Sequence, residues 1–190
     1  AEVFDRRNKL GMDLNRDALR LQAPESKVLK RIRDSLQADF GFNLHDQSRY
    51  YNAAFTPKPA TVSFLATAFN EAKDINETRK KSMQLIVRMN EVLQILAPGQ
   101  VGRYDDTFEP RAFGDNIQKW GTSLVLIESG GYQNDLEKQV IRRLNFVTLI
   151  SALSAIGDES YAQEDHQDYF DMKKQLIFIL KINLTDQIMD

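Results

Sequence analysis

Apolar residues recur at helical spacing in three long stretches of the chain. The first begins at Pro24, a residue type favoured at the first position of a helix, and predicts a helix over residues 25–37. The second predicts a helix over residues 76–96, which a proline and a glycine end. The third has a broad apolar face and predicts a helix over residues 134–156.

Shorter apolar runs have the length and pattern of strands. The run TSLVLIES at residues 122–129 is nearly continuously apolar, which is typical of a strand buried on both faces. Further strand candidates are residues 39–46, 60–67 and 174–182. Because strands and helices alternate, the sequence predicts an α/β fold with a mixed, mostly parallel sheet flanked by helices on both faces.

Residues 97–120 contain glycine, proline and aromatic residues without any period. This composition predicts a long ordered loop, and long loops in compact domains tend to carry functional residues. The whole chain of 190 residues is 42% hydrophobic, which is enough to bury a core. We therefore expect residues 1–190 to form a single domain or a large part of one.

Charge and composition exclude several classes of partner. The net charge is −2 and basic residues are interspersed with acidic ones, so no electrostatic footprint for nucleic acid or anionic lipid is present. No apolar run approaches the roughly 18 to 20 residues of a membrane span, and the N-terminal AEVFDRRNKL does not resemble a signal peptide. The absence of cysteine excludes disulfides, thiolate metal sites and a cysteine nucleophile. We expect neither nucleic acid nor a membrane as a partner.

The adjacent residues Asn15 and Arg16 are a candidate clamp for a carboxylate. A guanidinium group binds a carboxylate through two parallel hydrogen bonds, and the neighbouring amide adds a donor. The alternative interpretation is a surface turn on which Arg16 pairs with Asp13 or Asp17. Spacing alone leaves both interpretations open.

Two polar residues stand at the predicted ends of strands, where ligands bind in α/β sheets. His45 is a candidate metal ligand through its neutral ring nitrogen, or a histidine that is merely hydrogen-bonded. Glu128 ends a buried strand, where a carboxylate is costly unless it is paired or used. It is therefore a candidate catalytic base or a structural anchor for the turn at Gly130 and Gly131. Tyr104 is a candidate for packing or for contact with a substrate.

The segments GMDLNRD, FGFNLHDQ and WGTSLVLIESGG, in this order, resemble the zinc carboxypeptidase family over residues 10–156. That resemblance implies that Asn15 and Arg16 grip the C-terminal carboxylate of a substrate. It also implies that His45 is a zinc ligand and that Glu128 is the general base. Tyr104 lies in the interval where the family places a tyrosine that covers the substrate.

The chain departs from the family at the zinc site. Family members carry an H-x-x-E zinc motif and an oxyanion-stabilising arginine upstream of the Asn-Arg segment, and this sequence contains no H-x-x-E. Zinc is thus an expected cofactor for which the chain supplies one ligand, His45. His166, in the acidic stretch QEDHQDYF, is expected in a solvated loop. We expect the C-terminal portion of a catalytic domain, with residues 157–190 as an extension.

The resemblance implies a zinc-dependent hydrolase that cleaves a peptide or amide bond next to a free carboxylate, inactive as this isolated chain. One alternative is a non-catalytic relative that binds carboxylates or peptides. Another is a zinc amidase or deacylase that acts on N-acyl amino acids or cell-wall peptides. The partner expected in each case is a peptide or small molecule with a free carboxylate. A homodimer is one way to cover the open sheet edge of such a fragment. Family members are often secreted or periplasmic.

Overall fold

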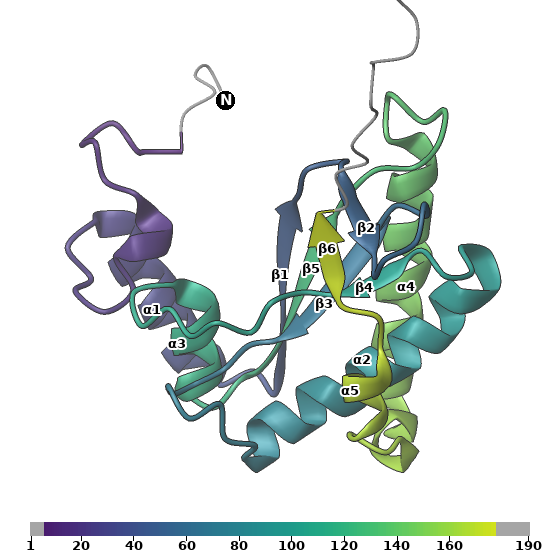
Figure 1. The fold of residues 1–190 in the computed structure, drawn as a ribbon. Coiled ribbons are helices and arrows are strands. Elements are labelled where there is room, and N and C mark those ends of the chain that lie inside the picture. Colours follow the sequence, from purple (N-terminus) through teal and green to yellow (C-terminus); the bar gives the residue numbers. More distant parts are fainter. Residues whose placement is uncertain (1–5, 178–190) are drawn as a thin grey trace, which may run out of the picture.

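The fold is built around a four-stranded sheet in the computed structural model, which describes residues 6–177 (Figure 1). Its strands are β1 (Phe40–Asp46), β3 (Val62–Ala66), β4 (Val101–Arg103) and β5 (Ser123–Ser129), in the order β1-β5-β3-β4. β1 is parallel to β5 and β3 is parallel to β4, whereas β3 and β5 are antiparallel. The predicted α/β class with a mixed, mostly parallel sheet is therefore confirmed.

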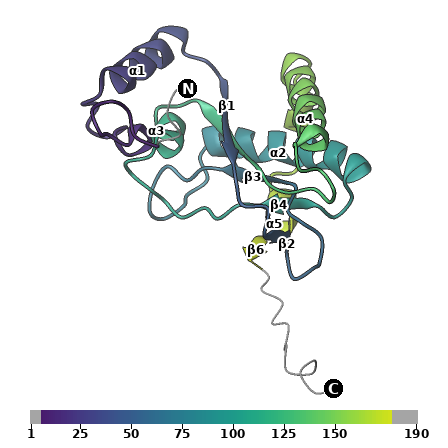
Figure 2. The same ribbon diagram turned by 90° about the horizontal axis from the view of Figure 1, so that it is seen from above.

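Helices pack on both sides of this sheet. They are α1 (Pro24–Leu36), α2 (Glu77–Leu96), α3 (Phe113–Lys119), α4 (Gln139–Gly157) and the short α5 (Asp168–Asp171). α2 and α4 pack against each other on one side, whereas α1 and α3 lie on the other (Figures 1 and 2). A second sheet pairs β2 (Tyr51–Ala53) with β6 (Gln175–Ile177) in antiparallel orientation. Two 3-10 turns, η1 (Leu14–Arg16) and η2 (Ser160–Gln163), complete the elements.

Strand alternation separates an apolar core from a polar face of the sheet. Val125 and Ile127 of β5 and Phe64 of β3 are buried against α2 and α4. The side chains between them, such as Leu126 and Glu128, project from the opposite face. This second face is where polar residues gather.

The sequence-predicted elements are recovered where the apolar period is strong. The helices predicted at 25–37 and 76–96 are α1 and α2, and the strands predicted at 39–46, 60–67 and 122–129 are β1, β3 and β5. The helix predicted from residue 134 begins only at Gln139. The reason is that both carboxylate oxygens of Asp135 accept backbone N–H groups of the first turn, so the side chain of Asp135 takes the place of a further helical turn.

The prediction of a loop over residues 97–120 is wrong. This segment contains β4 and α3, both too short to display a period. Of the strand predicted at 174–182, β6 accounts for residues 175–177, and the rest lies outside the described residues. β2, with three residues, was not predicted from the sequence.

Residues that follow α4 belong to the same core. Tyr169 is fully buried, and its hydroxyl oxygen accepts the backbone N–H of Ala66 in β3 at 3.2 Å. Tyr161 and Met172 also join the core cluster. The part of the 157–190 extension that the structure describes is therefore packed against the sheet.

One helix of the described residues, α4, is long and apolar enough to cross a membrane by length and composition alone. Its inner side is packed in the fold, where Asn145 donates to Ser129 Oγ and Thr148 is buried. Only 28% of its apolar 18-residue stretch is buried, however, so an apolar outer side remains uncovered by the described residues.

Candidate functional site

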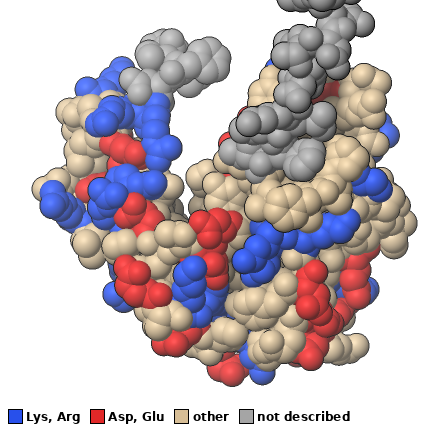
Figure 3. Space-filling view, in the orientation of Figure 1, with Lys and Arg blue, Asp and Glu red and all other residues tan. Residues whose placement is uncertain are grey.

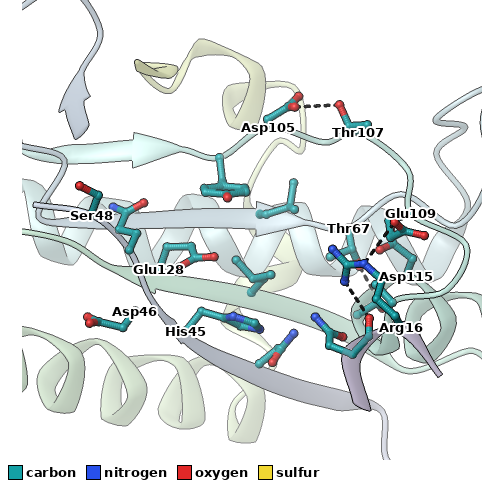
Figure 4. A pocket seen from close by; sticks show the side chains of 18 of the residues that line it. Arg16, His45, Asp46, Ser48, Thr67, Asp105, Thr107, Glu109, Asp115 and Glu128 are labelled. Atoms are coloured by element: carbon teal, nitrogen blue, oxygen red, sulfur yellow. Dashed lines mark hydrogen bonds and ion pairs between the residues drawn. The ribbon is translucent and has the colours of Figure 1, made fainter. Parts of the chain in front are cut away.

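All five residues singled out from the sequence line one pocket of about 440 Å³ on the polar face of the sheet. They are Asn15, Arg16, His45, Tyr104 and Glu128. Up to 113 positions separate them along the chain, as the numbers 15 and 128 show. Figure 4 shows His45 and Glu128 at one end of the pocket and Arg16 at the other.

His45 and Glu128 lie side by side because β1 and β5 are parallel and pair in register. His45 is the register partner of Glu128, so both side chains project from the same face at the carboxyl ends of their strands. Burial and then the positive charge of Arg6 lower the pKa of His45, which favours the neutral imidazole. Burial and then the negative charge of Asp46 raise the pKa of Glu128 to about 7.

No described residue forms a hydrogen bond or an ion pair with the Glu128 carboxylate, although Glu128 is only 7% exposed. The turn that follows is held by other groups: Gly130 N–H donates to Thr61 O at 2.9 Å, and Thr61 Oγ1 donates to Gly131 O at 2.8 Å. The interpretation of Glu128 as the anchor of this turn therefore has no support in the contacts. Its carboxylate is buried and unpaired, as is typical of a functional group.

Asn15 and Arg16 are fixed by η1 and by α3. Asn15 Oδ1 accepts the N–H of Phe113 at the start of α3 at 3.0 Å, which leaves its Nδ2 group as a donor for a ligand. Arg16 Nη1 donates to Asn15 O at 2.8 Å, and Arg16 Nε lies 3.3 Å from Glu109 Oε2. Glu109, in a loop far along the chain, thus holds the guanidinium of Arg16 in the pocket.

The alternative pairing of Arg16 with Asp13 or Asp17 is not observed. Asp13 pairs with Arg6 at 2.6 Å and caps η1, and Asp17 accepts the N–H groups of Gln22 and Ala23 ahead of α1. Both acids therefore stabilise local backbone, and Arg16 is left to face the pocket.

Glu109 is the main competitor for a ligand at Arg16. Arg111 binds both of its oxygens at 2.8 Å, and this pair holds the pKa of Glu109 down at about 2. Because Arg111 also pairs with Glu109, an incoming carboxylate can replace Glu109 at Arg16 while Glu109 keeps Arg111 as its partner. Figure 3 shows acidic and basic side chains mixed on the face that it draws, with no field of one sign.

Tyr104 enters the pocket from the segment that follows β4. Its N–H donates to Phe64 O at 2.9 Å, which extends the pairing of β4 with β3. Burial raises the pKa of Tyr104, and the charge of Glu128 raises it further. The tyrosine therefore lies within electrostatic reach of the glutamate, in a position to contact a bound ligand.

The sequence pattern does not single out Asp115, a second carboxyl group in the pocket whose pKa is raised. It lies in the first turn of α3 and is 8% exposed, and burial raises its pKa to about 7. The stretch around it was interpreted as a loop, so no period could indicate burial. Asp105, Thr107 and Glu109 line the pocket from the same region.

The described residues do not by themselves fit a zinc site. Structural and catalytic zinc ions take at least three protein ligands. Among residues 6–177, no group of three or more His, Asp or Glu side chains is placed to hold a metal ion. His166 does not line the pocket; its Nδ1 lies 3.4 Å from Asp165 in the segment before α5.

Comparisons with models of known protein families, with curated proteins and with solved structures find no match to this chain. The interpretation of the site therefore rests on its geometry and on the sequence motifs.

The pKa of Glu128 predicts a specific pH dependence of stability. Because its folded pKa of about 7 lies above the usual glutamate value of 4.5, the native state holds this proton more firmly. The group thus lowers the free energy of unfolding as the pH rises through this window.

We expect Glu128→Gln to raise the free energy of unfolding by about 1 kcal/mol near pH 8, since pocket water screens part of the effect, and to change it little near pH 4. Urea denaturation at both pH values measures this, with the exposed Glu137→Gln as control. Equal effects at both pH values would contradict it.

Proposed function

We propose that this protein is a carboxypeptidase-like chain that binds a peptide or small amide through its free carboxylate. Asn15 and Arg16 bind the carboxylate, and the bond next to it lies towards His45 and Glu128. We do not expect residues 6–177 by themselves to catalyse hydrolysis, because the resemblance assigns one zinc ligand among them, His45, and no group of three is placed to hold a metal ion.

The observation that carries this proposal is the convergence of the three motifs on one pocket. Asn15 and Arg16 come from η1, His45 from β1 and Glu128 from β5. A carboxylate clamp at one end and an unpaired carboxyl at the other suit a ligand that is held at its terminus and attacked further along.

Glu128 has the properties of a general base at neutral pH. With a pKa of about 7 it is ionised in a large fraction of molecules at that pH, and it still binds a proton strongly. It can remove a proton from a water molecule that attacks the carbonyl carbon and return it to the leaving nitrogen, work typically worth ~100 to 10,000-fold in rate. A neutral His45 beside it suits a metal ligand.

Ligand binding tests the clamp without requiring turnover. The probes are N-acetylphenylalanine and its amide, which differ only in the terminal carboxylate. A charged hydrogen-bond pair is worth about 1.5–3 kcal/mol, so we expect the acid to bind roughly 10- to 100-fold more tightly. Arg16→Ala should remove this preference, whereas Arg20→Ala, at an exposed arginine outside the pocket lining, should retain it. Calorimetry or NMR titration measures both affinities. Equal binding of acid and amide to the unmodified protein would refute the clamp.

A second candidate function is carboxylate binding without cleavage. It is favoured by the absence, among residues 6–177, of three side chains that could hold a metal ion. A related amidase or deacylase would share the clamp and differ in substrate, so a panel of N-acyl amino acids and cell-wall peptides separates it from a carboxypeptidase.

A further inference from the structure

An apolar stripe on the outer side of α4 lacks a partner among residues 6–177. Phe146, Ile150 and Leu153 follow each other at spacings of four and three residues, so they share one side of the helix. They are 66%, 52% and 56% exposed. On the neighbouring edge strand β1, Leu44 is 62% exposed. Contiguous apolar surface of this kind marks interaction sites.

β1 itself presents free backbone groups along the same side of the molecule. Ser123 N–H donates to Asp39 O and Gln47 N–H donates to Ser129 O, so odd-numbered residues of β1 point their backbone groups at β5. The N–H and C=O groups of Phe42 and Leu44 therefore point outwards. β1 is at the edge of the four-stranded sheet, with no strand on its outer side among the described residues.

A hollow of about 650 Å³ joins these two features. Leu44 lines it from β1, and Phe146 and Leu149 line it from α4, together with Arg142 and Arg143. Figure 2 shows α1 and α4 on either side of β1, with the edge of the strand between them. A bound partner can thus pair with the strand and fill the hollow at the same time.

Charges at the two ends of the α4 stripe are complementary to each other. Arg142 and Arg143 lie at the N-terminal end, and Asp158 and Glu159 follow the C-terminal end. Among their contacts within residues 6–177 are local hydrogen bonds: Arg142 Nη1 donates to Gln139 Oε1 at 3.3 Å, and Asp158 Oδ1 accepts the N–H of Ser160 at 2.9 Å. Arg143 precedes Ile150 by seven positions and Asp158 follows it by eight, so at 3.6 residues per turn both lie on the same flank of Ile150. Two α4 helices packed antiparallel with their Ile150 residues at the centre therefore bring arginines next to acids at both ends.

We propose that this face binds a second copy of the chain in a two-fold symmetric dimer. Antiparallel pairing of β1 with its copy joins the two sheets, and the two α4 helices pack antiparallel on one side of the joined sheet. This interface is isologous, as dimer symmetry requires, because the same stripe and the same charges serve both subunits. The proposal is independent of the carboxylate chemistry of the pocket.

The exposed area is of the size that a dimer needs. A large aliphatic or aromatic side chain contributes on the order of 100 Å² when it is buried. The four side chains Leu44, Phe146, Ile150 and Leu153 therefore supply roughly half of the ~800 Å² per partner of a standard interface. In the proposed dimer the rest comes from the paired backbone of β1 and from the stems of Arg142 and Arg143, which line the same hollow.

Sedimentation and light scattering of the chain over a range of concentrations test the dimer. We expect Phe146→Asp to weaken it by about 30-fold or more, since a central apolar anchor is lost. Ile95→Asp is the matched control, because Ile95 is an exposed apolar residue on α2 that does not line the hollow, and its replacement should have no effect. Arg143→Glu should also weaken the dimer, and adding Asp158→Lys should restore it.

Cross-linking tests the position of the two-fold axis. The chain has no cysteine, so Ile150→Cys and Ile95→Cys each carry a single thiol. A short bismaleimide linker should join two Ile150→Cys chains and leave Ile95→Cys chains unlinked, because packed helices lie roughly 8–10 Å apart.

Three results would overturn the proposal. One is a protein that stays monomeric throughout the concentration range. A longer form of the polypeptide that is monomeric and buries Phe146 counts as the same result. Another is a dimer in which Asp158→Lys fails to rescue Arg143→Glu. The third is a monomer that binds phosphatidylglycerol vesicles through Phe146, which would make the stripe a membrane-binding surface.

Discussion

Replacing Arg79 by alanine is expected to lower the free energy of unfolding by about 3 kcal/mol or more. Arg79, at the start of α2, has the largest of the fully buried side chains in the described residues. Its Nε donates to Ala66 O at 3.1 Å, Nη1 donates to Lys73 O, and Nη2 pairs with Asp106 Oδ2 at 3.1 Å. The alanine variant would leave these acceptors without their donor inside the protein.

Arg79 also connects the core to the pocket. Asp106 lies between Tyr104 and Glu109, in the segment that lines the site, and Lys73 and Arg79 together keep the pKa of Asp106 low. Loss of Arg79 should therefore loosen this segment, so carboxylate binding should weaken together with stability. The position of residues 104–109 would then depend on a side chain that does not line the pocket.

Chemical denaturation compares three variants at this site. Arg79→Lys keeps a charge but not the planar fork, so it should lose most of the same stability. Arg88→Ala removes a partly exposed arginine of the same helix that pairs with Glu91, and it should change stability by less than about 1 kcal/mol. If Arg79→Ala cost no more than Arg88→Ala, the buried network would not be a stabilising feature.

Much of the fold could be predicted because its main elements have regular apolar periods. α2 and β5 are long enough, and buried enough, for the period to be plain in the sequence. α1 shows that a period predicts a helix but not its burial, since Val28, Ile32 and Leu36 of its apolar side are exposed. A periodic pattern records the local structure and leaves the partner of each face undetermined.

The site could be predicted in part, for a related reason. His45 and Glu128 stand at strand ends, and parallel strands bring such ends to one edge of the sheet, as β1 and β5 do. The partner of Arg16 could not be predicted, because Glu109 follows it by 93 positions, as their numbers show, and lies in a segment without a period. Asp115 was missed because α3, with seven residues, is too short to display one.

Replacing Gly130 by alanine is expected to lower the free energy of unfolding by about 3 kcal/mol and to disturb Glu128. A Cβ atom at this position would lie 2.2 Å from Ala60 O and 2.9 Å from Gln47 Nε2. The first contact is with backbone, so the chain itself has to move. Gly130 N–H is bonded to Thr61 O, which limits that movement.

The effect should reach the pocket because Gly130 lies two residues after Glu128 and packs beside Gln47, a lining residue that follows β1. Gln47 Nε2 donates to Ala60 O at 2.9 Å, and the new methyl group would occupy the space of this bond. The end of β5 should therefore shift relative to β1, and the pH-dependent stability difference between Glu128 and Glu128→Gln should shrink in this background.

Gly157→Ala is the matched control for this substitution. Gly157 ends α4, no atom lies within 4 Å of a Cβ built on it, and its φ is not positive. Alanine is favoured over glycine in helices by up to about 1 kcal/mol, so this variant should be neutral or slightly more stable. Thermal and urea denaturation of both variants make the comparison. A Gly130→Ala protein as stable as Gly157→Ala would show that the turn after β5 adapts freely, and the close packing of Gly130 on Ala60 could then not be what positions Glu128.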